Sequence, residues 1–144
     1  MVIERELYGN NHPDTARSIH NMANCYLNQE KFNLALEKYQ ESLGIQRAFY
    51  GETSQHPDIA RSLGSISRVL IKLGQYPQAE EKLQESLEMW QRIHSEPHAD
   101  TARSLFQLGD VNFLQGEYSK AQEKYERALP VSYTHLTLPT NREV

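Results

Sequence analysis

The sequence predicts an all-α fold, an α-solenoid of stacked antiparallel helix pairs, and three observations lead to this prediction. The heptads HPDTARS, HPDIARS and HADTARS begin at residues 12, 56 and 98, at steps of 44 and 42 residues. Between them, apolar residues return with the 3.6-residue period of a helix. Small residues also recur where the two helices of a pair would approach each other. Self-similarity at such a period is typical of repeat architectures, in which each unit packs only on its neighbours.

The repeat extends well beyond the heptads. Gly74 and Gly116 match each other, and Glu30 stands at the equivalent point of the first unit. Three further sets follow the same steps: Phe32, Tyr76 and Tyr118; Ala35, Ala79 and Ala121; and Leu43, Leu87 and Leu129.

These steps divide the chain into five segments. Residues 1–10 contain VIERELYG, which matches IQRAFYG at 45–51, so we expect them to be the end of a preceding unit's second helix. Three units follow at 11–53, 54–96 and 97–129, the last with a shortened second helix. Residues 130–144 form a tail outside the repeat.

Each unit is expected to hold two helices joined by a short polar break. The first helices are predicted at 14–28, 58–73 and 100–115, and the second helices at 31–49, 76–94 and 118–129. Pro13 and Pro57 fit a chain that is entering a helix. Three aspartates at the heads of the first helices suit either N-capping or the positive end of the helix dipole. They are Asp14, Asp58 and Asp100, and we interpret the histidines before them (His12, His56 and His98) as turn residues.

The helices of a pair are predicted to pack through small residues. Ala23 and Gly109 allow the first helix to approach closely, and Ser67 stands at the matching position. Aromatic rings at 26, 32, 39, 76, 118 and 125 are expected to fill the remaining space. The alanines that keep the second helix close are Ala35, Ala79 and Ala121.

The helical pattern is expected to stop after Leu129. Pro130 removes a helix donor and collides with the preceding turn, at a cost of about 3 kcal/mol in a helix interior. The sequence PVSYTHLTLPTNREV that begins there has no helical period. It resembles an adapter or vector read-through at the end of a transcript-derived sequence, and a natural flexible tail is the alternative. We expect residues 130–144 to be disordered.

The recurring residues together resemble the tetratricopeptide repeat (TPR). The pattern consists of a small residue at 23, 67 and 109, glycine at 74 and 116, an aromatic ring at 32, 76 and 118, and alanine at 35, 79 and 121. The usual unit of that family has 34 residues, and these units are eight to ten residues longer. The longer unit, with HPD at its start and LYG or FYG closing the unit before it, is similar to the kinesin-light-chain and nephrocystin-3-like subgroup. The resemblance covers residues 1–129 and implies a right-handed TPR superhelix.

Composition limits the possible partners and location. The 144 residues carry a net charge of −4, which argues against nucleic acid as the main partner. No apolar run approaches the length of a membrane span, and the N-terminus has charges where a signal peptide needs apolar residues. The single cysteine, Cys25, excludes an internal disulfide and suits a cytoplasmic location. We therefore expect neither a nucleic acid nor a membrane as partner.

The sequence offers little for catalysis. It contains no glycine-rich phosphate loop, so no cofactor is predicted, and Cys25 is interpreted as a packed thiol. His94, Glu96 and His98 superficially resemble a zinc-binding helix, but Pro97 breaks the i, i+4 geometry that this motif needs. The heptad histidines recur once per unit, which is not expected of catalytic residues. We predict no metal site and no enzymatic activity.

The resemblance implies that the first helix of each pair lines a concave groove in which family members hold extended peptides. Residues one turn apart on these helices are therefore the candidate binding residues. Arg17, Arg61 and Arg103 form a row with one arginine per unit. The alternative is that these arginines bridge adjacent units and that Phe113 packs on a following unit. The candidates are Arg17, His20 or Asn21, Asn24, Arg61, Arg68, Lys72, Arg103, Gln107 and Phe113.

These residues predict a groove that binds an acidic or carboxylate-bearing peptide, because arginine pairs with carboxylates in a fixed fork geometry. We therefore expect a non-catalytic, cytoplasmic scaffold or adaptor that binds a protein or peptide partner. The alternative is the regulatory arm of a larger multidomain signalling NTPase, whose chemistry would lie outside this chain. Apolar faces left on the terminal repeats also predict self-association.

Overall fold

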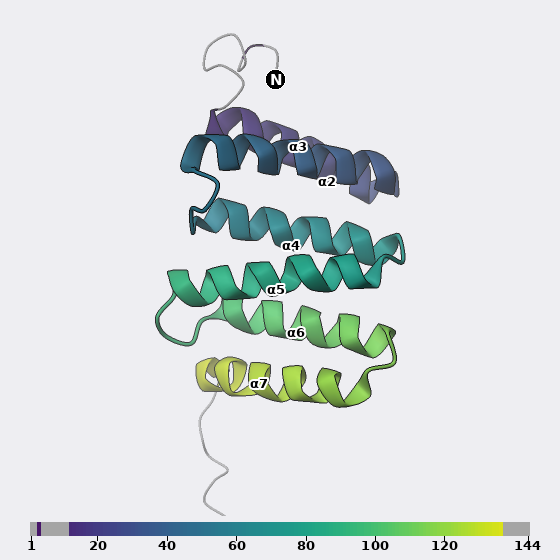
Figure 1. The fold of residues 1–144 in the computed structure, drawn as a ribbon, viewed down its shortest axis with the longest axis vertical. Coiled ribbons are helices and arrows are strands. Elements are labelled where there is room, and N and C mark those ends of the chain that lie inside the picture. Colours follow the sequence, from purple (N-terminus) through teal and green to yellow (C-terminus); the bar gives the residue numbers. More distant parts are fainter. Residues whose placement is uncertain (1–2, 4–11, 137–144) are drawn as a thin grey trace, which may run out of the picture.

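The fold was analysed in a computed structural model that describes residues 3 and 12–136, with side chains described as far as residue 129. These residues form six helices and no strand. The helices follow one another along the long axis of the molecule, each beside the next in the chain (Figure 1). The predicted all-α solenoid of helix pairs is therefore confirmed. The helices are α2 (Pro13–Asn28), α3 (Phe32–Tyr50), α4 (Pro57–Lys72), α5 (Tyr76–Ile93), α6 (Ala99–Leu114) and α7 (Tyr118–Leu136).

The first five of these helices begin and end within one residue of the predicted bounds, and α7 begins where it was predicted to begin. In the part of the chain that the structure describes, no helix is both long and apolar enough to cross a membrane. The end of a preceding unit that we predict at residues 1–10 falls, apart from Ile3, outside the described residues.

The histidine of each heptad is the N-cap of its helix, so the first helices start differently from the prediction. His12 Nδ1 accepts a hydrogen bond from the backbone N–H of Asp14 at 3.0 Å. His56 and His98 do the same for the aspartates two residues further on, at 3.0 and 3.1 Å. The aspartates therefore lie in the first turn of the helix, where a carboxylate interacts favourably with the dipole. The N-capping role proposed for them was wrong, because the imidazole nitrogen already accepts the exposed N–H.

The turn between the helices of each pair uses a residue with positive φ. Gly74 and Gly116 adopt φ values of 76° and 80°, and Glu30 adopts 60° at the equivalent point of the first unit. In each turn the next residue donates its N–H back across the end of the first helix, as from Lys31 to the carbonyl oxygen of Tyr26 at 2.8 Å. This bond pattern closes a helix by a left-handed residue, a position that favours glycine.

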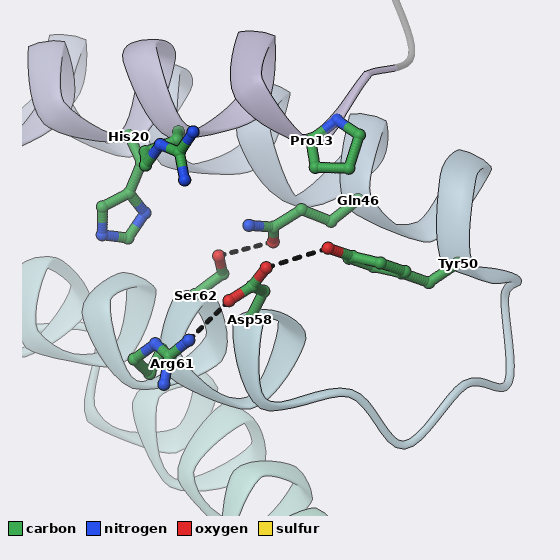
Figure 2. A pocket seen from close by; sticks show the side chains of 8 residues that line it. Pro13, His20, Gln46, Tyr50, Asp58, Arg61 and Ser62 are labelled. Carbon is green, nitrogen blue, oxygen red and sulfur yellow. Dashed lines mark hydrogen bonds and ion pairs between the residues drawn. The ribbon is translucent and has the colours of Figure 1, made fainter.

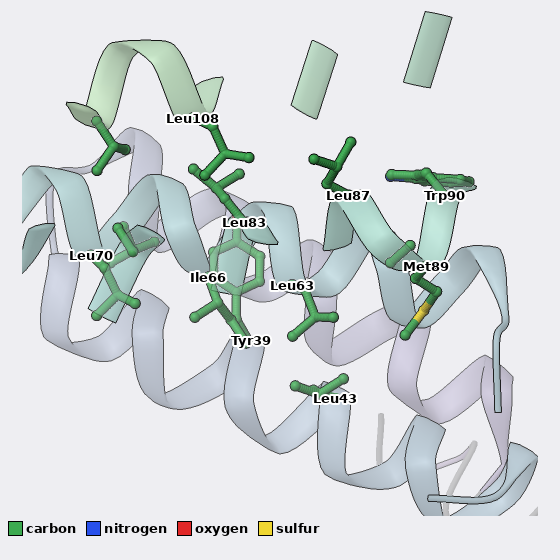
Figure 3. Packing of buried hydrophobic residues seen from close by; sticks show 14 of the residues in the cluster. Tyr39, Leu43, Leu63, Ile66, Leu70, Leu83, Leu87, Met89, Trp90 and Leu108 are labelled. Carbon is green, nitrogen blue, oxygen red and sulfur yellow. The ribbon is translucent and has the colours of Figure 1, made fainter. Parts of the chain in front are cut away.

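Most of the core is one cluster of side chains from consecutive helices (Figure 3), and a smaller cluster is formed by Ala16, Ile19 and Ile45. The three alanines of the second helices, Ala35, Ala79 and Ala121, are at most 2% exposed. Ala23, Ser67 and Gly109 are also buried, so the small residues lie where close helix packing requires them. The largest buried side chains that fill the space between the helices are Tyr39, Ile19, Ile59, Leu63, Ile66, Leu83, Leu87 and Leu108.

Two side chains predicted to be buried, Cys25 and Tyr118, are exposed, and Leu129 is exposed although its counterparts in the other units are buried. Cys25 lies on the surface of α2, because it is two residues beyond buried Ala23 and so points to another side of the helix. Tyr118 is 63% exposed and Leu129 is 58% exposed, whereas their counterparts Phe32 and Leu43 are partly or fully buried. No helix follows α7 among the described residues, so no described residue beyond α7 packs on this end of the stack.

The last helix continues beyond its predicted end. α7 runs through Pro130 to Leu136, so the prediction of a shortened helix and a disordered tail was wrong as far as residue 136. A proline removes one i to i−4 hydrogen bond, and the turns on either side of it keep theirs. Ahead of Pro130, buried Ala128 anchors α7 on the core. The rest of the predicted tail, residues 137–144, lies outside the described residues.

Candidate functional site

Two adjoining hollows lie along the first helices of the units. The first has a volume of about 300 Å³ and is lined by α2, the end of α3 and the start of α4 (Figure 2). The second, of about 180 Å³, is lined by α4, α5 and α6 together with His20 of α2. His20 and Arg61 line both hollows, so the two form one groove across three units. We call these two hollows together the first-helix groove.

Five of the predicted site residues line this groove. They are Arg17, Arg61, Arg68, Arg103 and Gln107. Of the alternatives His20 and Asn21, it is His20 that lines the groove. Asn24 instead accepts a hydrogen bond from the hydroxyl of Tyr39. Asn21 and Lys72 are exposed and line neither hollow.

Phe113 also lies outside the groove. Its ring is 55% exposed and contacts that of Tyr118 edge to face, with 5.3 Å between the ring centroids. The ring therefore contacts the second helix of its own unit.

The row of arginines is paired within its own helices. Arg17 pairs with Asp14, Arg61 with Asp58 at 2.5 Å and Arg103 with Asp100 at 2.8 Å. Each pair joins residues three apart in one turn of a single helix, and not residues of adjacent units as the alternative interpretation would have it. Their side chains are 60 to 69% exposed, and exposed pairs of this kind contribute only about 0.3–0.5 kcal/mol. The carboxylate of a ligand can therefore replace the aspartate in each pair with little loss of free energy.

Arg68 differs from the arginines of this row. Among the described residues no carboxylate lies within ion-pair distance of it, and its guanidinium lies 3.5 Å from Ser65 Oγ. The equivalent residues of the other units are Asn24 and Asp110, each of which accepts a hydrogen bond from a tyrosine hydroxyl. In the second unit that tyrosine is replaced by Leu83. Arg68 therefore brings a positive charge to the groove that no aspartate neutralises.

His20 lies between the two hollows and is held neutral. Burial lowers the pKa of its imidazole below 6.5, and the positive charges of Arg68 and Arg61 lower it further, against a smaller opposing effect of Asp58. Its ring also packs edge to face on Tyr39, with 4.9 Å between the centroids. A neutral imidazole beside two arginines can accept a proton when an anion enters.

The groove also contains residues that the sequence did not single out. Gln46, Tyr50 and Ser62 line the first hollow, and the hydroxyl of Ser62 donates to Gln46 Oε1 at 2.7 Å (Figure 2). Trp90, only 4% exposed, and Gly64 line the second. Gln46, Tyr50 and Trp90 lie on second helices, which a search confined to the first helices misses. Gly64 was identifiable, because it occupies the same repeat position as His20 and Phe106.

The loops that join one unit to the next carry a second recurring arrangement. At the first junction Tyr50 stacks on His56, with 3.7 Å between the centroids, and its hydroxyl donates to Asp58 Oδ2 at 3.0 Å. At the second junction His94 stacks on His98, with centroids 3.6 Å apart, and its Nε2 lies 3.2 Å from Asp100 Oδ2. The first junction borders the groove through Tyr50 and Asp58.

Comparison with known proteins agrees with the fold of stacked helix pairs. A family model for the tetratricopeptide repeat matches residues 2–48 and 54–133. No curated protein sequence matches the chain. Among solved structures, BtubC (BKLC) from P. vanneervenii is similar with a TM-score of 0.84 and 22% identity, over 99% of this chain and 56% of that one. Nearly identical TPR-like repeats from a kinesin-light-chain-like protein of P. anserina give a TM-score of 0.76 at 20% identity, over 95% of this chain and 64% of that one.

A third solved structure, aspartyl phosphate phosphatase F from Bacillus subtilis, gives a TM-score of 0.70 at 18% identity, over 83% of this chain and 30% of that one. At these identities the likeness concerns the fold. The long, kinesin-light-chain type of repeat that we expected is thus confirmed at that level. The chain spans less than two thirds of the length of each of these structures.

Proposed function

Because this chain belongs to the tetratricopeptide repeat family, we propose that it is a non-catalytic scaffold whose first-helix groove binds an acidic peptide segment of a protein partner. Repeats of this family generally mediate interactions between proteins. The finer proposal, an extended peptide with carboxylate side chains, is supported by the residues that line the groove.

The observation that carries the proposal is the position of Arg68. It lines the second hollow beside His20 and Arg61 and has no carboxylate partner among the described residues. A guanidinium offers several N–H donors in a fork that matches a carboxylate, and such charge-assisted bonds are about twice as strong as neutral ones. A peptide carboxylate at Arg68 would gain this interaction without breaking an existing ion pair.

The remaining lining residues suit the rest of an extended peptide. Arg17, Arg61 and Arg103 can exchange their local aspartates for peptide carboxylates, since these pairs are exposed and weak. Gln107 also lines the second hollow and offers an amide that can hydrogen-bond to the peptide backbone. Acidic rather than nucleic-acid recognition fits the size of the hollows and a net charge of −4, which repels a continuous phosphate backbone.

Peptide titration tests this proposal. Fluorescence anisotropy would compare a glutamate-rich peptide with a lysine-rich peptide of equal length against the wild type, Arg68→Ala and Arg92→Ala. Arg92 is an exposed arginine on α5 that lines neither hollow, so its variant carries the same change in charge. We expect micromolar binding, about −8 kcal/mol, of the acidic peptide only, weakened in Arg68→Ala and by salt.

Equal affinity of the two arginine variants would overturn the proposal for the groove. Binding of the lysine-rich peptide with the same strength would overturn its acidic specificity. The double variant Arg61→Ala/Arg68→Ala removes both cations beside His20 and should bind more weakly than either single variant.

Other expectations stay predictions. No observation on the described residues tests three of them. These are the cytoplasmic location, self-association through the terminal repeats and the role as the regulatory arm of a larger signalling NTPase. The exposed rings of Phe106 and Phe113, each 55% exposed, could receive an apolar anchor of the same partner. Phe106 packs against Tyr125 at a centroid distance of 5.2 Å, so it is the better positioned of the two.

A further inference from the structure

The junction between α5 and α6 brings together two histidines and an aspartate outside the groove. His94 Nε2 lies 3.2 Å from Asp100 Oδ2, and His98 Nδ1 lies 3.3 Å from the same oxygen. One ligand atom from each residue lies within 4.8 Å of the other two, and the described residues contain no other such group. We propose that His94, His98 and Asp100 bind a divalent transition-metal ion of the zinc class.

The donor set fits this class of ion. Two imidazole nitrogens and one carboxylate oxygen are ligands that zinc accepts, and three protein ligands leave a coordination position for water. The side chains of His94, His98 and Asp100 are 26%, 45% and 22% exposed. An ion can therefore reach them from solvent, while the surrounding protein removes part of their hydration.

Asp100 is oriented for such a role by Arg103. Arg103 donates to Oδ1 at 2.8 Å, whereas Oδ2 faces the two histidines. A hydrogen-bonded carboxylate of this kind is typical of metal sites, because the outer partner fixes the orientation of the ligand. The positive charge of Arg103 also repels a cation, so the site is expected to be weaker than a structural zinc site with four protein ligands.

The two imidazole rings must tilt when the ion binds. They are stacked nearly parallel, at 10° between planes and 3.6 Å between centroids, so their in-plane lone pairs do not converge on one point. Both rings border solvent and can rotate about χ2. A neutral imidazole has one nitrogen without a proton, and in His98 this nitrogen, Nδ1, accepts the N–H of Asp100 at 3.1 Å. Ligation through Nδ1 would therefore replace this cap, which is a further reason to expect a weak site.

The first junction provides an internal comparison. Tyr50, His56 and Asp58 form the same stack and the same hydrogen bond to the aspartate, with a phenol in place of the imidazole of His94. That junction therefore has one ligand fewer. Pro97 prevents a zinc motif on a single helix, but the ligands here come from the end of α5 and the start of α6, on either side of Pro97.

Metal binding here would join the second and third units. His94 is the C-cap residue of α5 and His98 is the N-cap residue of α6. An ion held by both binds the folded arrangement and not the separated units, so it should raise the melting temperature, and by more as the free ion concentration rises above its Kd.

The test uses the full chain, freed of metal by a chelator, in a Cys25→Ser background that removes the exposed thiol as a competing ligand. Isothermal titration with ZnCl₂ and the visible spectrum with CoCl₂ would be recorded for the parent, His94→Tyr and His56→Asn. His94→Tyr copies the first junction, and His56→Asn removes the histidine of that junction while keeping a good N-cap residue.

We expect one zinc ion per chain at this site and a higher melting temperature with zinc. His94→Tyr should weaken binding by about tenfold or more, since even the loss of an outer partner costs that much, and should lose the thermal shift. His56→Asn should change neither. If His94→Tyr does not reach the parent's melting temperature without metal, His98→Asn replaces it in the comparison. The proposal would be overturned if the folded variant, His94→Tyr or His98→Asn, bound zinc as tightly as the parent and showed the same rise in melting temperature.

Discussion

Gly109 of α6 lies directly against the ring of Tyr125 of α7. A β-carbon placed on Gly109 would meet Cε1 of that ring at 2.6 Å and Cδ1 at 2.8 Å, closer than real contacts allow. The ring cannot easily move, because its hydroxyl donates to Asp110 Oδ1 at 2.6 Å. Burial, followed by this bond to Asp110, raises the pKa of Tyr125 to about 12, so the hydroxyl keeps its proton at physiological pH.

Gly109→Ala should therefore destabilise the third unit. Overpacking usually costs about 1–3 kcal/mol, and the better helix propensity of alanine offsets up to about 1 kcal/mol of this. The second unit has Ser67 and Leu83 at the equivalent positions, where a larger first residue faces a smaller second one. In a Tyr125→Leu background the same alanine substitution should cost much less. Urea unfolding gives the free energy of unfolding of the wild type, Gly109→Ala, Tyr125→Leu and the double variant. An equal cost of Gly109→Ala with Tyr125 and with Leu at position 125 would contradict the explanation.

Glu30 occupies a turn position that the other two units give to glycine. Its φ of 60° places a side chain in the left-handed region, which costs about 1–2 kcal/mol for a residue with a β-carbon. Glu30→Gly should therefore raise the free energy of unfolding by about 1 kcal/mol. Gly74→Ala should lower it by a similar amount, and Glu37→Gly, in the middle of α3, should also lower it. A loss of stability in Glu30→Gly, measured by urea unfolding, would contradict the argument from φ.

The helices and their pairing were predictable because they depend on local patterns that recur three times. Periodic apolar residues, small residues at 23, 67 and 109, and glycines after the first helices act within a few residues or between adjacent helices. The capping role of the histidines was not predictable from residue preference, since Asp is a common N-cap residue and His is not. It depends on the imidazole nitrogen reaching an N–H two residues ahead.

The groove was predictable only in part. The repeat period placed Arg17, Arg61 and Arg103 in one row. Each heptad also has an aspartate three residues before its arginine, so these i, i+3 pairs were predictable from the sequence and were missed. The importance of Arg68 follows from what surrounds it, Leu83 in place of a tyrosine and no nearby carboxylate, which only the packed helices show. Second-helix residues such as Trp90 reach the groove across a unit boundary, and no pattern within one helix indicates this.

Gly64 keeps the groove open at its centre. A β-carbon added there meets no atom within 4 Å, so the position has room for a side chain. Gly64→Leu should fold with equal or greater stability, by up to about 1 kcal/mol, because leucine favours a helix more than glycine does. It should reduce the affinity for the acidic peptide, since it fills part of the second hollow.

Gly44→Leu is the matched control for this substitution. Gly44 lies in α3, where an added β-carbon also meets no atom within 4 Å, and it lines neither hollow. Its variant should gain similar stability and keep full affinity. Unchanged binding in Gly64→Leu, measured by the same anisotropy titration, would exclude the second hollow as the peptide site.

His20 should make the free protein less stable as the pH falls. Burial, Arg68 and Arg61 keep the pKa of this imidazole in the folded chain below its ordinary value of 6.5, so the unfolded chain binds the proton more readily. Stability contributed by the neutral form is therefore present above pH 6.5 and is lost as the pH falls from there to the folded pKa. His20→Gln should show a smaller loss of unfolding free energy over this interval. A wild-type loss no larger than that of the variant would contradict the assignment to His20.

Binding of an acidic peptide should reverse this effect at His20. A carboxylate placed beside the imidazole offsets the positive charges of Arg68 and Arg61, adds to the effect of Asp58, and so raises the pKa of His20 in the complex. Proton uptake then accompanies binding, and the affinity of the wild type should rise as the pH is lowered from about 8 to about 5.5, where peptide carboxylates remain ionised. The hydroxyl of Tyr39, whose pKa is raised by burial, stays neutral throughout. In His20→Gln the affinity should depend less on pH, and a wild-type affinity that falls over this range would show that the peptide carboxylate does not lie beside His20.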